Sequence, residues 1–576
     1  MSLSEANCTS FHYEPLDGRQ IRVLHLDGGR DLTPLTGRLE HVELAEQMPY
    51  AALSYEWGNH ERNHAIFLQN HSVIKITKSL YSALRDIRRT FAFNDCKLIW
   101  ADAVCIDQDN IEERQRQVSI MGHIYRNADH VVTYIGPETE DTPLGLELAI
   151  QLVEYATKNQ GQPDPRLQLP SELVNLGFPP AEDPKWKAFR SLVTRKWAGR
   201  CWCVQEFLLN RRIIMMCGRQ QIMWFLLPAI VQQVFNRTLP TIAIPGHADD
   251  PEALRECLVL IGMMRDDGVG QKLRPSLRTL LRQTHALKAS DPRDKIYSLL
   301  GLTDDGKLLD IKVDYSRRVE DLYTEVAASI LAADQSPMLL YDVLGERSLQ
   351  LPSWVPDWSA WRFGSHGVLS PAWYKASGST DALVHVDAEN HHLHLRGGLV
   401  DRIGQLRGSI GVHYRGGNDS DRAEWLEEQV QFVDSKKSFS DGSAARCALW
   451  KTLLCGLSFQ EEPVEDDYER YFDAHRNLNP GSSSAERDIS REFKDSVRRR
   501  CRYRSLCLVD KGYLGAVPET AMIGDWICVV DGANSLFVIR ESGPLFTLVG
   551  TAYVHGLMFG EAPALPHYQK RTLILE

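Results

Sequence analysis

The feature that most constrains this chain is an alternation of strand-like and helix-like patterns between residues 50 and 218. The nearly all-apolar run Tyr50–Tyr55 ends at a Trp-Gly pair, as a buried strand that enters a loop does. Leu80, Leu84 and Ile87 then follow at helical spacing. Because such alternation is typical of α/β domains, we predict a largely parallel sheet flanked by helices over residues 49–220.

Acidic residues follow the next buried strand of this segment. The apolar run Leu98–Ala101 leads directly into Asp102, and Asp107 comes five residues later. In α/β folds ligands gather at the carboxyl edge of the strands, so these acids are candidates to bind a ribose or a cation. Asx turns and helix caps explain acids after a strand equally well, and both interpretations stay open.

The length of 576 residues exceeds what one hydrophobic core usually organises, so we expect two or three domains. Residues 1–48 form an N-terminal lead to the α/β domain, and residues 221–345 have mainly helical patterns. Short alternating runs with many Gly, Pro and Trp predict a β-rich region over residues 346–576. A polar, acidic stretch at about residues 461–500 is predicted to be an insertion in that region.

Several function classes are excluded by composition. The net charge of −11 and the absence of a long basic run argue against nucleic-acid binding. The longest apolar stretch, Ile222–Phe235, is interrupted by Pro228 and is too short to span a bilayer, and the N-terminus lacks the layout of a signal peptide. The 12 Cys show no zinc-ligand spacing. We therefore expect a cytoplasmic protein with reduced thiols, without a metal and without membrane or nucleic-acid partners.

Four separated motifs, in this order, resemble the fungal heterokaryon-incompatibility (HET) domain: Tyr50–Gly58, Leu98–Gln108, Glu113–Tyr125 and Arg200–Glu206. Beyond that domain, further segments are similar to the long form of these proteins: Ser290–Gly301, Leu351–Trp358, Gly512–Gly515 and Val554–Glu561. The resemblance implies a role in non-self recognition after fusion of unlike hyphae, with programmed cell death as the output. It also implies self-association or a partner incompatibility protein.

The same family remotely resembles TIR domains, through Leu53–Tyr55 at the end of the first strand and through Trp202–Phe207. In TIR enzymes a glutamate at the matching position supports cleavage of the nicotinamide–ribose bond of NAD, and here that residue is Glu206. The resemblance thus implies an NAD nucleosidase (a hydrolase) that uses NAD as a substrate and needs no cofactor. The candidate substrate-binding residues are then Ser54, Tyr55, Trp57, Asp102 and Asp107.

Each candidate also has a structural interpretation. Glu206 could be a carboxylate at a helix N-terminus, paired with Arg200 or Arg212. Trp57 could cover the core instead of stacking on a base. The whole domain could be a non-enzymatic adaptor, because a fold alone does not carry an activity.

Two further groups are predicted to be structural. Asn110 is expected to cap the helix that follows it, with Glu113 and Arg114 in its cap and surface. The loop Asp291–Asp294 is expected to hold mutual salt bridges.

Overall fold

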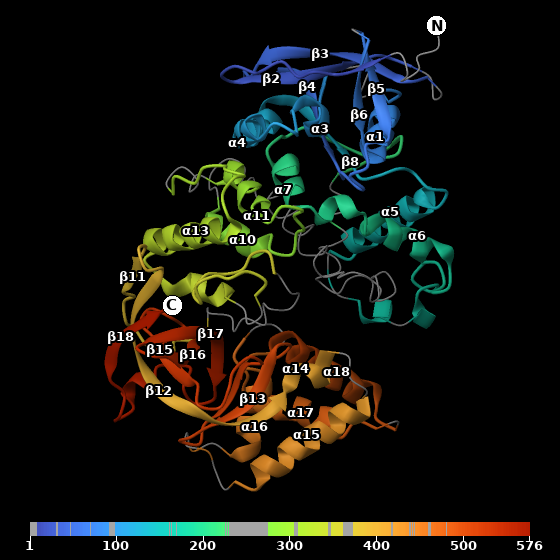
Figure 1. The fold of residues 1–576 in the computed structure, drawn as a ribbon. Coiled ribbons are helices and arrows are strands. Elements are labelled where there is room, and N and C mark those ends of the chain that lie inside the picture. The colour runs from blue at the N-terminus through green and yellow to red at the C-terminus, as the bar shows by residue number, and fades with distance from the viewer. Residues whose placement is uncertain are drawn as a thin grey trace. The chain divides into compact units, whose positions relative to one another are not determined.

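The structure is a computed structural model that describes residues 8–29, 33–45, 48–69, 71–90, 98–160, 162, 164–168, 170–224, 226, 229, 275–303, 309–343, 347–360, 373–415, 419–436, 439, 442, 444–458, 462–479 and 481–576. The chain divides into two compact units, Met1–Arg317 and Arg318–Glu576. In Figure 1 the first unit runs from blue to yellow-green, and the second continues to red.

A ten-stranded sheet organises the N-terminal unit, in the order β1-β6-β5-β3-β2-β7-β4-β8-β9-β10. Its centre is parallel, because β4 pairs in parallel with β7 and β8, and β8 pairs in parallel with β9. Antiparallel pairs join β2 to β3 and to β7, β5 to β6, and β9 to β10. The strands are β1 (Thr9–Ser10), β2 (Gln20–Leu26), β3 (Leu35–Glu43), β4 (Met48–Tyr55), β5 (His64–Leu68), β6 (Ser72–Ile76), β7 (Leu98–Trp100), β8 (Ala128–Tyr134), β9 (Ile213–Cys217) and β10 (Gln220–Ile222).

The predicted α/β class is confirmed, but the sheet is mixed rather than largely parallel. From residue 49 onward the hairpins β5–β6 and β9–β10 are antiparallel, and residues 1–48, which the sequence analysis set apart as a lead, add further antiparallel pairs. Residues 1–48 supply β1, β2 and β3, and the β2–β3 hairpin enters the sheet antiparallel to β7. A two-stranded hairpin is antiparallel by construction, so its insertion beside the parallel strands makes the sheet mixed.

Helices cover both faces of this sheet, and strand β4 shows how the two faces are divided. Ala51 and Leu53 share one core cluster with α1 (Lys78–Ile87), whereas Ala52 belongs to another with α4 (Ile111–Asn127). Successive side chains of a strand point to opposite faces, so one apolar run fills both cores. The remaining helices of the unit are α3 (Asp102–Cys105), α5 (Thr142–Lys158), η2 (Pro165–Gln168), η3 (Pro170–Glu172), α6 (Pro184–Val193), η4 (Lys196–Gly199), α7 (Cys201–Leu208), α10 (Leu277–Gln283), α11 (Asp294–Tyr297) and η6 (Leu300–Leu302).

The predicted helical middle, residues 221–345, spans the boundary between the two units. Its described part contains α10, α11 and η6 in the first unit, then α13 (Val319–Asp334) and η7 (Pro337–Asp342) in the second. Residues 225, 227, 228 and 230–274, and with them most of the apolar stretch Ile222–Phe235, lie outside the described residues.

The C-terminal unit is built on a mainly antiparallel sheet in the order β11-β12-β13-β14-β17-β16-β15, with β18 against β12 and β17. The predicted β-rich region is confirmed, and the long strand β12 also pairs with β15. The strands are β11 (Val384–Asp387), β12 (His392–Ser409), β13 (Arg504–Val509), β14 (Leu514–Pro518), β15 (Trp526–Val530), β16 (Leu536–Ser542), β17 (Leu545–Val554) and β18 (Lys570–Leu575).

Helices also pack in this unit, including within the stretch predicted as a polar insertion. Residues 461–500 contain α17 and α18, and Phe493 and Val497 of α18 are buried in the core of the unit. A capping box between Ser483 and Glu486 begins α18. The helices are α14 (Ile410–Arg415), α15 (Asp419–Asp434), α16 (Ala445–Leu453), η8 (Asp466–Tyr468), α17 (Glu469–Arg476), α18 (Ser484–Arg500) and η9 (Ala562–Ala564).

Candidate functional site

Three elements bring the candidate residues together in the N-terminal unit. Ser54 and Tyr55 end the central parallel strand β4, whose neighbour β7 leads into α3 at Asp102. Glu206 lies on α7 and hydrogen-bonds to Ser54, 152 residues away in the sequence. The site therefore forms at the carboxyl ends of parallel strands, where α/β folds commonly bind ligands.

The innermost part of the site is a chain of three buried polar groups. The Ser54 hydroxyl donates to Glu206 Oε2 at 2.5 Å and accepts from Trp197 Nε1 at 2.7 Å. Ser54 is fully buried, Glu206 is 2% exposed and Trp197 is fully buried. The hydroxyl thereby joins a neutral donor to a carboxylate and fixes the position of the carboxylate.

Arg200 is the cation of the site, but it does not form a tight ion pair with Glu206. Its Nη1 lies 3.9 Å from Glu206 Oε1, and the same nitrogen donates a hydrogen bond to the Tyr55 carbonyl. Its side chain is 19% exposed, so the arginine forms the more accessible side of the pair. Burial lowers the pKa of Arg200, and the charges of Glu206 and Asp102 raise it by more.

Trp57 and Asp102 form an outer pair beside this arginine. Trp57 Nε1 donates to Asp102 Oδ2 at 2.8 Å, and both residues are half-buried. Burial raises the pKa of Asp102, while the Arg200 charge and the Trp57 hydrogen bond oppose that rise. Burial also raises the pKa of Tyr55, and the Asp102 charge raises it further.

The carboxyl group of Glu206 has a pKa well above its ordinary value. Burial raises its pKa to about 7, and the Arg200 charge and the Ser54 hydrogen bond only partly oppose this. Glu206 also lies in the last turn of α7, so the structural interpretation that placed it at a helix N-terminus is wrong. The helix dipole disfavours a negative charge at that end. Of its two suggested partners Arg200 is the nearby one, since Arg212 pairs with Asp129.

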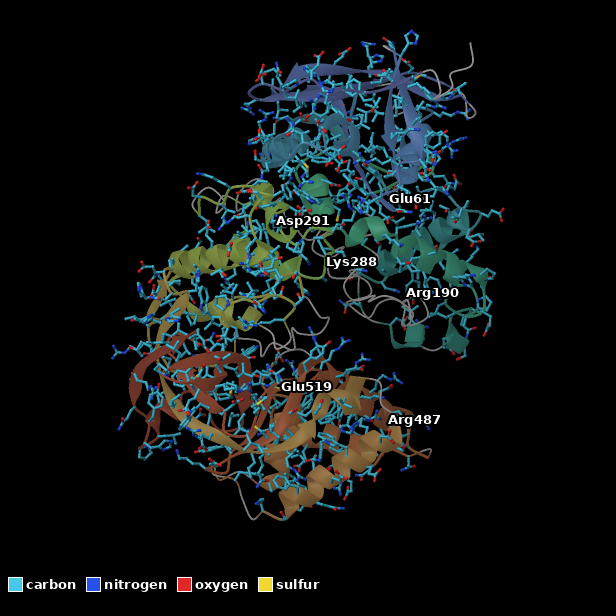
Figure 2. All side chains as sticks on the ribbon, viewed as in Figure 1. Glu61, Arg190, Lys288, Asp291, Arg487 and Glu519 are labelled. Atoms are coloured by element: carbon cyan, nitrogen blue, oxygen red, sulfur yellow. The ribbon has the colours of Figure 1, made fainter. Side chains whose placement is uncertain are left out.

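The segment that follows α10 holds α7 in place. The backbone of Lys288 pairs with Gly199 and Cys201, one on each side of Arg200. Farther along α7, Gln205 packs so closely on Gly301 that a side chain at Gly301 would collide with its amide. Figure 2 labels Lys288 and Asp291 on this segment. The position of Arg200 and Glu206 thus depends on residues well beyond α7.

The same segment contains the loop that was predicted to be structural. Arg293 forms two hydrogen bonds with Asp291, which confirms the expected salt bridge. Asp294 instead accepts from the Tyr315 hydroxyl at 2.6 Å. Burial raises the pKa of Asp294 to about 6, and hydrogen bonds from Tyr315 and Trp202 oppose that rise.

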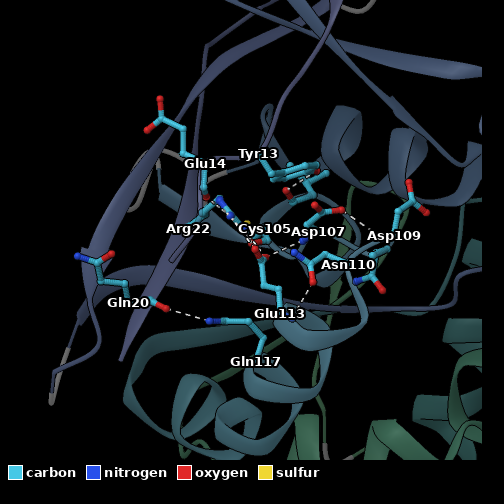
Figure 3. Close-up of polar contacts among 12 residues, drawn as sticks. Tyr13, Glu14, Gln20, Arg22, Cys105, Asp107, Asp109, Asn110, Glu113 and Gln117 are labelled. Carbon is cyan, nitrogen blue, oxygen red and sulfur yellow. Dashed lines mark hydrogen bonds and ion pairs between the residues drawn. The ribbon is translucent and has the colours of Figure 1, made fainter. Parts of the chain in front are cut away.

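A second buried Glu–Arg pair lies on the other side of α3, and Figure 3 shows its contacts. Arg22 Nη1 and Nη2 bind Glu113 Oε1 and Oε2 at 2.5 and 2.9 Å, with Arg22 fully buried and Glu113 3% exposed. Glu113 Oε1 also accepts from the Asp107 amide at 2.8 Å. Burial raises the pKa of Glu113, but the hydrogen bonds from Arg22 and Asp107 lower it by more.

This second pair corrects part of the interpretation of helix α4. Asn110 does cap the helix through the Glu113 amide, as predicted. The Glu113 side chain, however, is buried against Arg22 instead of lying in the cap or on the surface, and Arg114 lies over the Tyr315 ring at 4.4 Å. The Asp107 amide donates to Glu113, the Asp107 carboxylate accepts from the Asp109 amide, and the Asp107 carbonyl accepts from the Asn110 amide.

Two functional neighbours were not found from the sequence. Trp197 carries the hydrogen bond that positions Ser54, and Arg22 neutralises Glu113. Arg22 had a visible signal, because it is an arginine between the apolar residues Ile21 and Val23 of a strand. Trp197 had none, since nothing in the short segment Lys196–Gly199 shows where its indole N–H will point.

The described ranges contain neither a cluster of metal ligands nor a membrane-spanning helix. Within these ranges there is no group of three or more His, Cys, Asp or Glu that could hold a metal ion. The described helices include none that is both long and apolar enough to cross a membrane.

Two family models match parts of the chain. The model of the heterokaryon incompatibility protein (HET) family matches residues 50–206, which contain every member of the site, and the Het-6 β-barrel domain matches residues 418–571. The chain therefore carries a HET domain over residues 50–206 and a Het-6 β-barrel domain over residues 418–571.

One relative aligns with most of the chain. The chain is 24% identical to heterokaryon incompatibility protein 6, OR allele, of Neurospora crassa over 624 aligned positions, which cover 89% of each chain. No solved structure matches the chain significantly.

Proposed function

We propose that this protein acts in heterokaryon incompatibility, as a cytoplasmic component of fungal non-self recognition whose output is programmed cell death. The HET match, the Het-6 barrel match and the similarity to an incompatibility protein along 89% of both chains support this role. In this proposal the N-terminal unit delivers the output. The C-terminal unit senses the non-self signal or restrains the N-terminal unit. It does so through self-association or through a partner incompatibility protein.

The chemistry that we propose for the output is TIR-like hydrolysis of NAD. The bond between nicotinamide and ribose breaks, water supplies the new oxygen on the ribose carbon, and nicotinamide and a proton leave. The transition state carries positive charge on the ribose, which a nearby carboxylate stabilises. Glu206 is that carboxylate in this proposal, with Ser54 orienting it and Trp57 and Asp102 contacting the nucleotide.

One observation carries the enzymatic proposal: the two buried Glu–Arg pairs of this unit differ in protonation. The pKa of Glu113 is lowered, whereas the pKa of Glu206 is raised to about 7. A carboxyl group that titrates near the working pH costs stability when it is ionised, and such groups are concentrated at functional sites. Glu206 is nevertheless 2% exposed, so the more exposed Arg200 has to move aside before a substrate can reach it.

The same burial favours a second candidate function, a non-enzymatic adaptor. If Arg200 does not move, Glu206 only positions Ser54 and Trp197, and the domain acts by assembling partners.

Expression of the full-length chain in a fungal host separates the two candidates. Growth and cellular NAD are followed for the wild type, for Glu206→Gln and for Glu112→Gln, which changes an exposed glutamate in the first turn of α4. The enzymatic proposal expects the wild type and Glu112→Gln to consume NAD and arrest growth. Glu206→Gln should lose nicotinamide release by the purified protein by about 100-fold or more.

Other outcomes decide against parts of the proposal. Growth arrest by Glu206→Gln with unchanged NAD supports the adaptor. Normal growth at verified levels of the wild-type protein argues against a cell-death output altogether.

A further inference from the structure

Two buried thiols lie in contact in the C-terminal unit, far from the candidate site in the sequence. The Sγ atoms of Cys455 and Cys501 are 3.7 Å apart, both residues are fully buried, and 46 positions separate them in the chain. Cys455 lies in the turn that follows α16, with a φ of 48°. Cys501 is the C-cap of α18. The pair thus joins the ends of two helices.

The surroundings of the pair distinguish its two sulfurs. Arg500 and Arg504 both act on the Cys455 thiol through their charge. Burial raises the pKa of Cys455, but the hydrogen bond from Cys501 and the two arginines lower it by more. The pKa of Cys501 is raised, first by burial and then by its neighbour. The lowered pKa of Cys455 and the raised pKa of Cys501 favour Cys455 as the nucleophile of the pair.

We propose that Cys455 and Cys501 form a redox-active dithiol, a modification site at which hydrogen peroxide produces an intramolecular disulfide. The sulfurs must approach by about 1.7 Å to reach bonding distance. In the first step the Cys455 thiolate attacks a peroxide oxygen, the O–O bond breaks, and the departing hydroxide takes up a proton to become water. Cys455 is then a sulfenic acid.

In the second step Cys501 attacks the Cys455 sulfur. The S–S bond forms, the S–O bond breaks, and the oxygen leaves as water with the proton of Cys501. In total two thiols and one peroxide give one disulfide and two waters, so the thiols are oxidised by two electrons and the peroxide is reduced by two. A dithiol reductant reverses the reaction by thiol–disulfide exchange.

The same unit contains matched internal controls. Cys507 on β13 and Cys528 on β15 are as fully buried as the pair. Burial raises the pKa of each of these thiols to about 12. Burial alone therefore predicts four inert thiols, whereas the pair geometry predicts that two of the four react.

Disulfide formation has a structural consequence. The bond closes a loop that contains η8, α17 and α18, and it ties the end of α18 to the turn after α16. Because a cross-link reduces the freedom of the unfolded chain, oxidation should raise the melting temperature of this unit by about 5 °C.

The test uses the folded full-length protein, first fully reduced and then exposed to hydrogen peroxide. Remaining thiols are alkylated after unfolding, and the digest is analysed by mass spectrometry with and without dithiothreitol. We expect a cross-linked Cys455–Cys501 peptide, lighter by two hydrogen atoms than the two reduced peptides, while Cys507 and Cys528 are recovered alkylated. In Cys501→Ser the sulfenic acid on Cys455 should persist and react with dimedone.

Three results would overturn the proposal. One is full alkylation of Cys455 and Cys501 at peroxide doses that already oxidise Cys507 or Cys528. Another is oxidation of the two thiols to sulfinic acid without a cross-link, and the third is a cross-link of either thiol to a different cysteine. The wild-type peptide map alone is decisive, so the result stands even if Cys501→Ser does not fold.

Discussion

The N-terminal unit contains two buried glutamates, each beside an arginine, and they are held in opposite ways. Glu113 binds Arg22 through both carboxylate oxygens, at 2.5 and 2.9 Å. Glu206 has its arginine 3.9 Å away and a hydroxyl as its direct donor. The pKa of the first is lowered and that of the second is raised to about 7.

The difference shows that burial beside an arginine does not by itself make a carboxylate structural. In the Arg22 pair both charges are hydrogen-bonded, which offsets the cost of removing them from water. At Glu206 the nearest arginine donates to the Tyr55 carbonyl instead, so the desolvation cost of the carboxylate is not offset. Glu113 therefore stabilises the fold when it is ionised, whereas an ionised Glu206 costs stability and is expected to be retained for function.

The largest loss in the free energy of unfolding should come from breaking the pair of Arg22 and Glu113. Glu113→Gln leaves Arg22 buried with an uncompensated charge, so we expect a loss of about 3–5 kcal/mol in the free energy of unfolding, measured by denaturant titration. The double variant Arg22→Met with Glu113→Met removes both charges and should recover most of that loss. A loss below about 1 kcal/mol for the single variant would show that the pair is not structurally important.

A smaller effect on the free energy of unfolding is expected at Glu206. Its pH dependence has the opposite sign to that expected at Glu113. The folded-state pKa of Glu206 is raised from 4.5 to about 7, so between these values the unfolded state binds fewer protons and stability falls as pH rises. The total contribution is about 3 kcal/mol. The wild type should therefore lose stability relative to Glu206→Gln between about pH 4.5 and pH 7, with little further change above.

Glu113 gives the matching control for that measurement. Because its folded-state pKa is lowered, its contribution is present above the unfolded pKa and is lost as the pH falls through the folded pKa. Parallel pH profiles for Glu206→Gln and Glu113→Gln, each relative to the wild type, would contradict the contrast between the two pairs.

Ser54→Ala should give the smallest effect of the series. The change removes the donor to Glu206 and leaves the Trp197 N–H buried without its acceptor, so we expect a loss of about 1–2 kcal/mol. The pKa of Glu206 should also rise, because the Ser54 hydrogen bond lowers it. Carboxyl chemical shifts followed by NMR would detect this rise, and Ser119→Ala on the exposed side of α4 serves as the control.

The sequence predicted the edge of the sheet better than the interior of the site. Apolar runs that end in Ser54 and Asp102 reveal where strands stop, because strand burial leaves a local pattern. The position of Glu206 in the last turn of an eight-residue helix has no such pattern, since short helix boundaries depend on packing. The choice of partner is likewise a tertiary property, so Arg22 and Trp197 could not be assigned to Glu113 and Ser54.

The mixed sheet illustrates the same limit. The alternation of patterns after residue 50 predicts parallel strands correctly for β4, β7 and β8. The hairpin β2–β3 comes earlier in the chain, and only the folded structure shows that it pairs with β7.

The most direct test of the central claim is the free energy of unfolding of Glu206→Gln at pH 8, measured beside Glu113→Gln. At this pH Glu206 is mostly ionised in the wild type, so removing its charge relieves a buried, weakly compensated carboxylate. We predict that Glu206→Gln is at least as stable as the wild type, while Glu113→Gln is strongly destabilised. A loss of about 3 kcal/mol or more for Glu206→Gln would contradict the account, because both glutamates would then be structural carboxylates.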